Sequence, residues 1–243
     1  MDGKPVNHQS GVSCYAEYAV VDRGSIVVID KTLPLDVAAL FGCAVVTGVG
    51  AVVNTAQIQP GSSVAVVGLG GVGLSGLMGA VLGGASQIVA IDLSDEKLGL
   101  ASQLGATHTV NAKDADHVKQ VRDLTNGGVD YAFDLAGTIK AMETAYLVTR
   151  WGGTTVTAGL SPISADFSFK QSVLVSEEKT IKGSYMGSCV PVRDIPRFIS
   201  LYQEGKLPVD RMMSQRIGFD EINVGFDRLQ DVATVRQVLV PHG

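Results

Sequence analysis

Hydrophobic runs and glycine-containing turns alternate from residue 63 onward. Short apolar runs rich in valine and isoleucine predict six strands, at 63–68, 87–92, 108–112, 129–137, 154–160 and 180–185. Longer segments between them predict helices, at 74–83, 94–105, 114–126 and 140–151. Strands that alternate with helices through short connections form parallel sheets covered by helices on both faces. The predicted fold class is therefore α/β, with a doubly wound, six-stranded parallel sheet.

The two ends of the chain follow other patterns. Residues 15–30 alternate apolar and polar positions on either side of Gly24, which predicts antiparallel β structure. The C-terminal part predicts helices at 191–205 and 219–230 and a last strand at 235–240.

One long stretch, residues 37–91, contains no charged residue and would attract a membrane-span interpretation. Polar residues at 54, 57 and 59, the Pro60-Gly61 turn and the glycines at 68–73 divide it into segments shorter than the roughly 20 residues that a span requires. We therefore expect no membrane partner, and we interpret the stretch as strands buried on both faces by helices.

Charge and cysteine content narrow the range of partners. The formal net charge is -5, and no cluster of Lys or Arg offers a field for phosphate backbones, so nucleic acid is not an expected partner. The three cysteines, Cys14, Cys43 and Cys189, form neither a CxxC pair nor an even disulfide framework. Because the N-terminal residues also lack a secretory signal pattern, we expect a cytoplasmic protein.

A GxGxxG motif directly follows the first predicted strand and opens a helix. In such motifs Gly68 permits a tight turn, Gly70 lets the backbone approach a pyrophosphate, and Gly73 allows close packing of helix on strand. The motif alone is weak evidence, because glycine-rich turns of this kind also occur in SAM-dependent enzymes. Asp92 ends the second strand about 20 residues further on, where a carboxylate can bind ribose hydroxyls. Together they predict a dinucleotide site.

The acidic residue also favours one cofactor. A carboxylate at Asp92 would repel a 2'-phosphate, so NAD is expected rather than NADP. Lys97 could lie beside the same ribose, although a solvated lysine on a helix is an equally good interpretation. Without a ligand, Asp92 itself would be a solvated acid or a cap for the next helix.

The run from Phe41 to Ala51, followed by Gln59-Pro60-Gly61 and by residues 66–74, resembles the zinc-dependent alcohol dehydrogenases of the medium-chain dehydrogenase/reductase superfamily. The resemblance extends over essentially the whole chain, including Leu104-Gly105-Ala106-Thr107 and Val235-Arg236-Gln237-Val238. It implies a Rossmann sheet flanked by remnants of a GroES-like catalytic domain. The implied division is a catalytic-domain remnant at 1–46, an NAD-binding domain at 47–187 and a returning segment at 188–243.

The resemblance also implies roles for individual residues. Cys43 matches a ligand of the catalytic zinc, Thr47 a catalytic-site residue beside the nicotinamide, Val72 the side chain behind its ring, and Arg236 a pyrophosphate contact. Gly71 and Gly159 are assigned to the cofactor site as well. By their residue types alone, Cys43 would be a small buried hydrophobe, Thr47 a helix cap, Val72 a core residue and Arg236 a surface ion-pair residue.

The family takes the two further zinc ligands from a region before the match to Met1, so we expect a chain that lacks part of the catalytic domain and is inactive by itself. The expected complete enzyme transfers hydride between an alcohol or aldehyde and NAD, with zinc as Lewis acid. Alternatives are a non-catalytic NAD(H)-binding module, a zinc-independent quinone reductase of the same superfamily and, less compatible with Cys43 and Arg236, a SAM-dependent methyltransferase. Family members usually pair through the last strand of the cofactor domain, so a homodimer or larger homo-oligomer formed through 166–184 is expected.

Overall fold

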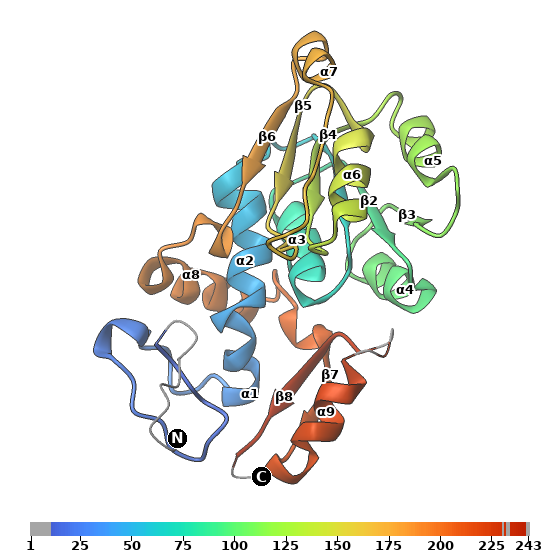
Figure 1. Cartoon of the computed structure of the whole chain (residues 1–243). Helices are drawn as coiled ribbons and strands as arrows, with labels where there is room; N and C mark the ends of the chain where they lie inside the picture. Colours follow the sequence, from blue (N-terminus) through green and yellow to red (C-terminus); the bar gives the residue numbers. More distant parts are fainter. Residues whose placement is uncertain (1–10, 230, 232–233, 242–243) are drawn as a thin grey trace.

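The computed structural model describes residues 11–229, 231 and 234–241, and a six-stranded parallel sheet forms its centre (Figure 1). The strand order is β3-β2-β1-β4-β5-β6. This order places β1 and β4 side by side at the centre, so the chain reverses its winding direction there. The prediction of a doubly wound α/β fold is confirmed. The strands are β1 (Ser63–Val67), β2 (Gln87–Asp92), β3 (His108–Asn111), β4 (Val129–Asp134), β5 (Thr149–Thr157) and β6 (Thr180–Gly183).

Helices cover both faces of this sheet because alternate residues of each strand point to opposite sides. The helices after β1 to β4 are α3 (Gly71–Leu82), α4 (Asp95–Gln103), α5 (His117–Leu124) and α6 (Ile139–Val148). In β1, Val64 and Val66 belong to the core on the face covered by α3 and α4. Ala65 and Val67 belong to the core on the opposite face, which α5 and α6 cover. Burying one valine side chain completely in either core stabilises the fold by about 1.5–3 kcal/mol relative to leaving it exposed.

The start of β5 differs from the sequence prediction. Residues 149–151 were expected to end a helix, but they begin β5, and Thr149 pairs with Val129 of β4 before a register shift. Thr149 is fully buried and its hydroxyl bonds to that of Thr155 at 2.7 Å. A β-branched residue fits a strand better than the end of a helix, and the tertiary pairing decides the outcome.

The first half of the uncharged stretch is helical, so its interpretation as buried strands was wrong there. It contains α1 (Leu35–Ala38), η2 (Ala39–Gly42), α2 (Ala44–Gly50) and the π-helix η3 (Ala51–Ala56). All residues of α2 are buried, which explains why the segment shows no amphipathic period. Within the described residues no single helix is both long enough and apolar enough to span a membrane. The helical segments 35–42 and 44–56 reach that length and apolar character when they are taken together, but the chain bends by 51° between them.

The prediction of antiparallel β structure at 15–30 was wrong. This segment carries only the short helix η1 (Arg23–Ser25), and Tyr18, Val20 and Val28 are exposed. Strand formation needs a partner strand, and this segment pairs with none of the described strands.

The C-terminal part returns beside α1 and α2 (Figure 1). Its last two strands, β7 (Met213–Ile217) and β8 (Arg236–Leu239), pair in parallel to form a separate small sheet. The predicted strand at 235–240 is confirmed as β8. The last residue of the predicted helix 219–230 lies outside the described residues. The proposed boundaries after residues 46 and 187 stay predictions, and residues 1–10 of the first segment are not described. The other elements are α7 (Gln171–Ser176), η4 (Met186–Ser188), α8 (Pro191–Gln203), η5 (Val209–Met212), η6 (Phe219–Glu221) and α9 (Ile222–Arg228).

Candidate functional site

The turn between β1 and α3 has the geometry that its glycines predict. Gly68 has a φ of +88°, and its N–H donates to the carbonyl of Ile91 at 2.8 Å. A side chain at position 73 would collide with the Gly68 carbonyl, so the helix packs directly against the turn. Gly70 has open space on the side where a side chain would point. A ligand can therefore reach the backbone at Gly70.

The N-terminus of α3 lies beside an arginine from the other end of the chain. The helix begins at Gly71, with Gly70 as N-cap and no side-chain cap, so its first amides have no partner within the helix. Arg236 of β8 packs its guanidinium against Gly71, where a Cβ would collide with Nε. Nε of Arg236 is buried and has no hydrogen-bond partner among the described residues. Free amides, a helix dipole and an arginine converge here, which is a suitable environment for an anion.

Asp92 closes the same turn from β2. Its Oδ2 accepts the N–H of Leu69 at 2.6 Å and its Oδ1 accepts the N–H of Ser94 at 2.9 Å. Ser94 is the N-cap of α4, and its hydroxyl accepts the N–H of Lys97. Lys97 is half-buried in the first turn of α4. Asp92 therefore shapes the glycine turn and the start of α4 while its carboxylate stays half-buried at the end of β2.

A cavity of about 550 Å³ opens beside Asp92 at the carboxyl ends of β1 and β2. Its walls are mostly apolar side chains, and Gly68 and Asp92 lie at its edge. Sequence reasoning missed its polar lining on α5 and α6, because those residues belong to no motif and are far along the chain from the glycine turn. They are His117, Thr138, Lys140, Glu143 and Thr144. The imidazole of His117 bridges the Asp114 carbonyl at 2.8 Å and the Thr144 hydroxyl at 3.0 Å.

Gly159 lies at the end of β5, against the turn that follows β4. A side chain there would collide with the backbone of Gly137, which has a φ of +77°. Asp134 organises both turns: Oδ1 accepts the N–H groups of Ala136 and Gly137, and Oδ2 accepts the hydroxyl of Thr157 at 2.8 Å. Sequence analysis did not single out Asp134, although an acid at the end of an apolar strand was a usable signal.

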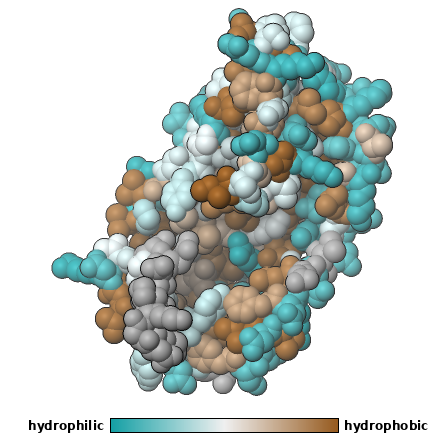
Figure 2. Space-filling view, viewed as in Figure 1, coloured by the Kyte–Doolittle hydropathy of each residue, from teal (hydrophilic) through white to brown (hydrophobic). Residues whose placement is uncertain are grey.

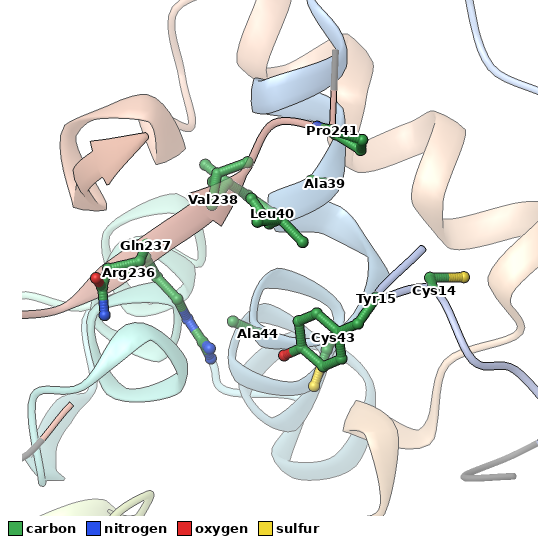
Figure 3. Close-up of a pocket in the computed structure, with 11 residues that line it drawn as sticks. Cys14, Tyr15, Ala39, Leu40, Cys43, Ala44, Arg236, Gln237, Val238 and Pro241 are labelled. Atoms are coloured by element: carbon green, nitrogen blue, oxygen red, sulfur yellow. The ribbon is translucent and has the colours of Figure 1, made fainter. Parts of the chain in front are cut away.

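Cys43 and Thr47 lie at the start of α2. Cys43 is exposed, not buried, and it lines a cavity of about 520 Å³ together with Tyr15 and Arg236 (Figure 3). Cys14 lines the same cavity, but its sulfur points in a different direction from that of Cys43 (Figure 3). Thr47 is buried inside α2 and does not cap it.

Helix α2 crosses α3 so closely that the backbones touch. A Cβ on Gly48 would lie 2.6 Å from the Gly76 amide nitrogen and would also collide with the Val72 carbonyl. The crossing brings Cys43, Thr47, Val72 and Gly71 to one side of the sheet. Lys97 lies in the first turn of α4, after β2, and Gly159 lies two residues after the end of β5.

The described residues contain no group of three or more His, Cys, Asp or Glu side chains that could hold a metal ion. Cys43 is the one proposed metal ligand among them.

The sequence profile of a zinc-binding dehydrogenase family matches residues 71–204. The chain belongs to that family. The match extends from the N-terminus of α3 through the rest of the sheet to α8.

Relatives and solved structures agree with this membership. The chain is 35% identical over 248 residues to an S-(hydroxymethyl)glutathione dehydrogenase of Paracoccus denitrificans, covering 99% of this chain and 66% of that protein. It superposes on benzyl alcohol dehydrogenase from Acinetobacter calcoaceticus with a TM-score of 0.88 and 33% identity, covering 91% of this chain and 61% of the other. An alcohol dehydrogenase zinc-binding domain protein from Burkholderia ambifaria gives 0.88 and 32%, covering 92% and 60%. The chain thus spans about three fifths to two thirds of the length of these proteins.

Proposed function

We propose that the chain binds NAD(H) across the carboxyl end of its sheet, with the pyrophosphate at the N-terminus of α3. The buried, unpartnered Nε of Arg236 against Gly71 carries this proposal. A buried guanidinium N–H without an acceptor is unfavourable, and a phosphate oxygen would satisfy it with a charge-assisted hydrogen bond. The open space at Gly70 and the uncapped helix start fit the same ligand.

The adenosine half extends from the pyrophosphate to Asp92. The Asp92 carboxylate retains acceptor capacity after binding the amides of Leu69 and Ser94, because an ionised carboxylate offers about four acceptor positions. Ribose hydroxyls can donate to it, whereas a 2'-phosphate would meet a like charge. This favours NAD over NADP, with Lys97 beside the same ribose.

The nicotinamide half extends toward α2. Val72 would lie behind the ring and Thr47 beside it. Gly159 packs against the backbone of Gly137 after β4, and its part in the cofactor site stays a proposal. NAD, when bound, supplies a hydride acceptor at its ring. The chain's own residues bind the pyrophosphate, orient the ring through the α2–α3 crossing and line the cavity that holds Cys43.

The metal does not fit the described residues by themselves. Catalytic zinc needs three protein ligands, and Cys43 has no two suitable neighbours among the described residues. The described residues alone would therefore not hold a catalytic zinc, and Cys43 stays a proposed ligand that needs two further ligands.

We further propose that the chain is the cofactor-binding portion of a cytoplasmic, homo-oligomeric NAD-dependent oxidoreductase of the alcohol dehydrogenase type, acting on a small alcohol or aldehyde and inactive by itself. Family membership and the names of its relatives support this reaction class. A non-catalytic NAD(H)-binding module is the second candidate, because the unpartnered Arg236 Nε supports a dinucleotide site whereas the described residues contain no group of metal ligands.

Fluorescence titration tests the binding step. The purified chain should bind NADH and prefer it strongly to NADPH. Absence of NADH binding would overturn the proposal, and equal affinity for the two cofactors would overturn the role of Asp92. An assay of alcohol-dependent NADH formation, with and without added zinc, then distinguishes the enzyme from the binding module.

A further inference from the structure

A short left-handed turn, η4, follows the carboxyl end of β6. Three successive residues, Met186, Gly187 and Ser188, have φ values of 48°, 64° and 51°. A residue with a side chain costs about 1–3 kcal/mol in such a conformation and keeps it only where its surroundings enforce it. Two such residues flank Gly187, so this turn needs strong external support.

That support comes from α2 and the π-helix η3. The Asn54 side-chain amide donates to the Gly187 carbonyl at 3.3 Å, and the hydroxyls of Thr55 and Ser188 bond at 2.8 Å. Gly50 approaches the turn so closely that its Cβ would lie 2.5 Å from the Gly187 carbonyl oxygen. The turn and the helix are therefore fixed relative to each other.

The result of this arrangement is a contact between Met186 and Thr47. The Thr47 hydroxyl donates to the Met186 Sδ at 3.8 Å. A threonine hydroxyl inside a helix commonly donates to the carbonyl one turn earlier. Here the Cys43 carbonyl accepts the Thr47 backbone N–H at 3.0 Å, and the hydroxyl is directed at the thioether.

We propose that Met186 is a positioning residue for the nicotinamide end of the site, acting through the orientation of the Thr47 hydroxyl. This inference rests on the proposed NAD(H) site and adds to it a residue outside every sequence motif. The strained turn serves to hold the thioether at Thr47. Although two left-handed residues are unfavourable, the turn that contains them holds the Thr47 hydroxyl in one orientation. The nicotinamide ring can then bind beside this hydroxyl without reorientation of the Thr47 side chain.

The test compares NADH with ADP-ribose, which lacks the nicotinamide ring. Met186→Leu keeps the side-chain volume and removes the sulfur acceptor. In the full chain it should weaken NADH about threefold to tenfold, the range expected for one neutral hydrogen bond, and leave ADP-ribose affinity within about twofold. Met142→Leu is the control, because Met142 is a buried methionine of α6. It should change neither affinity.

A double-mutant cycle with Thr47→Val completes the test. If Met186 acts through Thr47, the double variant should bind NADH no more weakly than Thr47→Val alone. Loss of NADH and ADP-ribose affinity to the same extent would show a structural role and overturn the inference, as would an unchanged NADH affinity. If the unmodified chain binds neither ligand, the proposed function fails as well; if it binds both and Met186→Leu has no effect, only this inference fails.

Discussion

The Asp92 carboxylate accepts the backbone N–H of Leu69, inside the glycine turn that follows β1, at 2.6 Å. One acid thus holds the turn in shape and faces the position proposed for the ribose. A substitution must separate these two tasks if it is to test cofactor choice.

Asp92→Asn keeps a carbonyl oxygen for one backbone amide but removes the negative charge. We expect NADH binding to weaken about tenfold to a hundredfold, since hydrogen bonds to charged groups contribute about 1.5–3 kcal/mol, and the preference for NADH over NADPH to narrow. Titration of both cofactors measures it. Ser94→Ala, which removes the cap of α4 but not the acid, is the control and should preserve the preference. If the ratio of NADH affinity to NADPH affinity were unchanged in Asp92→Asn, the negative charge of Asp92 would have no role in cofactor choice.

Gly71→Ala tests the pyrophosphate position. The new methyl group would occupy the place of the Arg236 Nε and displace the guanidinium. NADH and ADP-ribose should both bind about tenfold or more weakly, in contrast to the effect expected of Met186→Leu. Gly99→Ala is a suitable control, because that helical glycine has open space where a side chain would point. Equal binding by Gly71→Ala and the unmodified chain would contradict the proposed site.

Strands and glycine turns were predictable, whereas helix limits and distant contacts were not. The short apolar runs at β1 and β2, bounded by turn residues, are typical of strands buried on both faces in a parallel sheet, so the local pattern predicted them. The helix α2 has no such signal, because a helix buried all round has no polar face. Segment 15–30 has a strand pattern but pairs with none of the described strands. Local pattern does not predict pairing.

In the candidate site, too, the residues within local motifs could be predicted, whereas contacts between distant parts of the chain could not. The motif identified Gly68, Gly70 and Gly73, and the strand end identified Asp92. The contact of Arg236 with Gly71 joins residues that are far apart in the chain, and the contact of Met186 with Thr47 does the same. Resemblance suggested Arg236, but no sequence feature suggested Met186, because its importance depends on where the turn after β6 packs.

Cys189 should be the unreactive cysteine. Burial raises the pKa of its thiol to about 11, assisted by the nearby Asp194 charge, and its sulfur is held by the Asn54 amide and the Val46 carbonyl. At pH 8 only about one thiol in a thousand would then be ionised, and the thiolate is the nucleophile. With a slow alkylating reagent, mass spectrometry should find label on the exposed Cys14 and Cys43 first. Early labelling of Cys189 in the folded chain would contradict this.

Asp194 should stabilise the fold in a pH-dependent manner. It is fully buried near the start of α8; the Arg193 guanidinium, and then the Val190 N–H, lower the pKa of its carboxyl. A lowered pKa means that the stabilisation is complete above the unfolded value of about 3.9 and is lost as pH falls through the folded value. Asp194→Asn should cost about 1.5–3 kcal/mol at pH 7, and less below about pH 4. Urea unfolding of both proteins across this range measures the difference, and a constant gap would refute the linkage.

The proposed dimer can be tested at the free edge of β6. This strand pairs only with β5 among the described strands. Helix α7, which ends at Ser176 shortly before β6, exposes Val175 at 69%, and Ile163 in the segment between β5 and α7 is exposed as well. Brown patches interrupt the hydrophilic surface near the tip that carries α7 (Figure 2). An unpaired edge with apolar neighbours is an environment in which a second copy can pair.

Sedimentation velocity at tens of micromolar should therefore find a dimer or larger oligomer, and Val175→Asp combined with Ile163→Asp should shift it toward monomer. Val192→Asp on α8 is the matched control, because Val192 is 65% exposed and lies on a different element. It should leave the association unchanged if the contact is formed by the edge of β6 and by α7. A monodisperse monomer of the unmodified chain would refute the dimer. If Val192→Asp dissociated the oligomer to the same extent, the contact would not be confined to the edge of β6 and α7, and this assignment would be wrong.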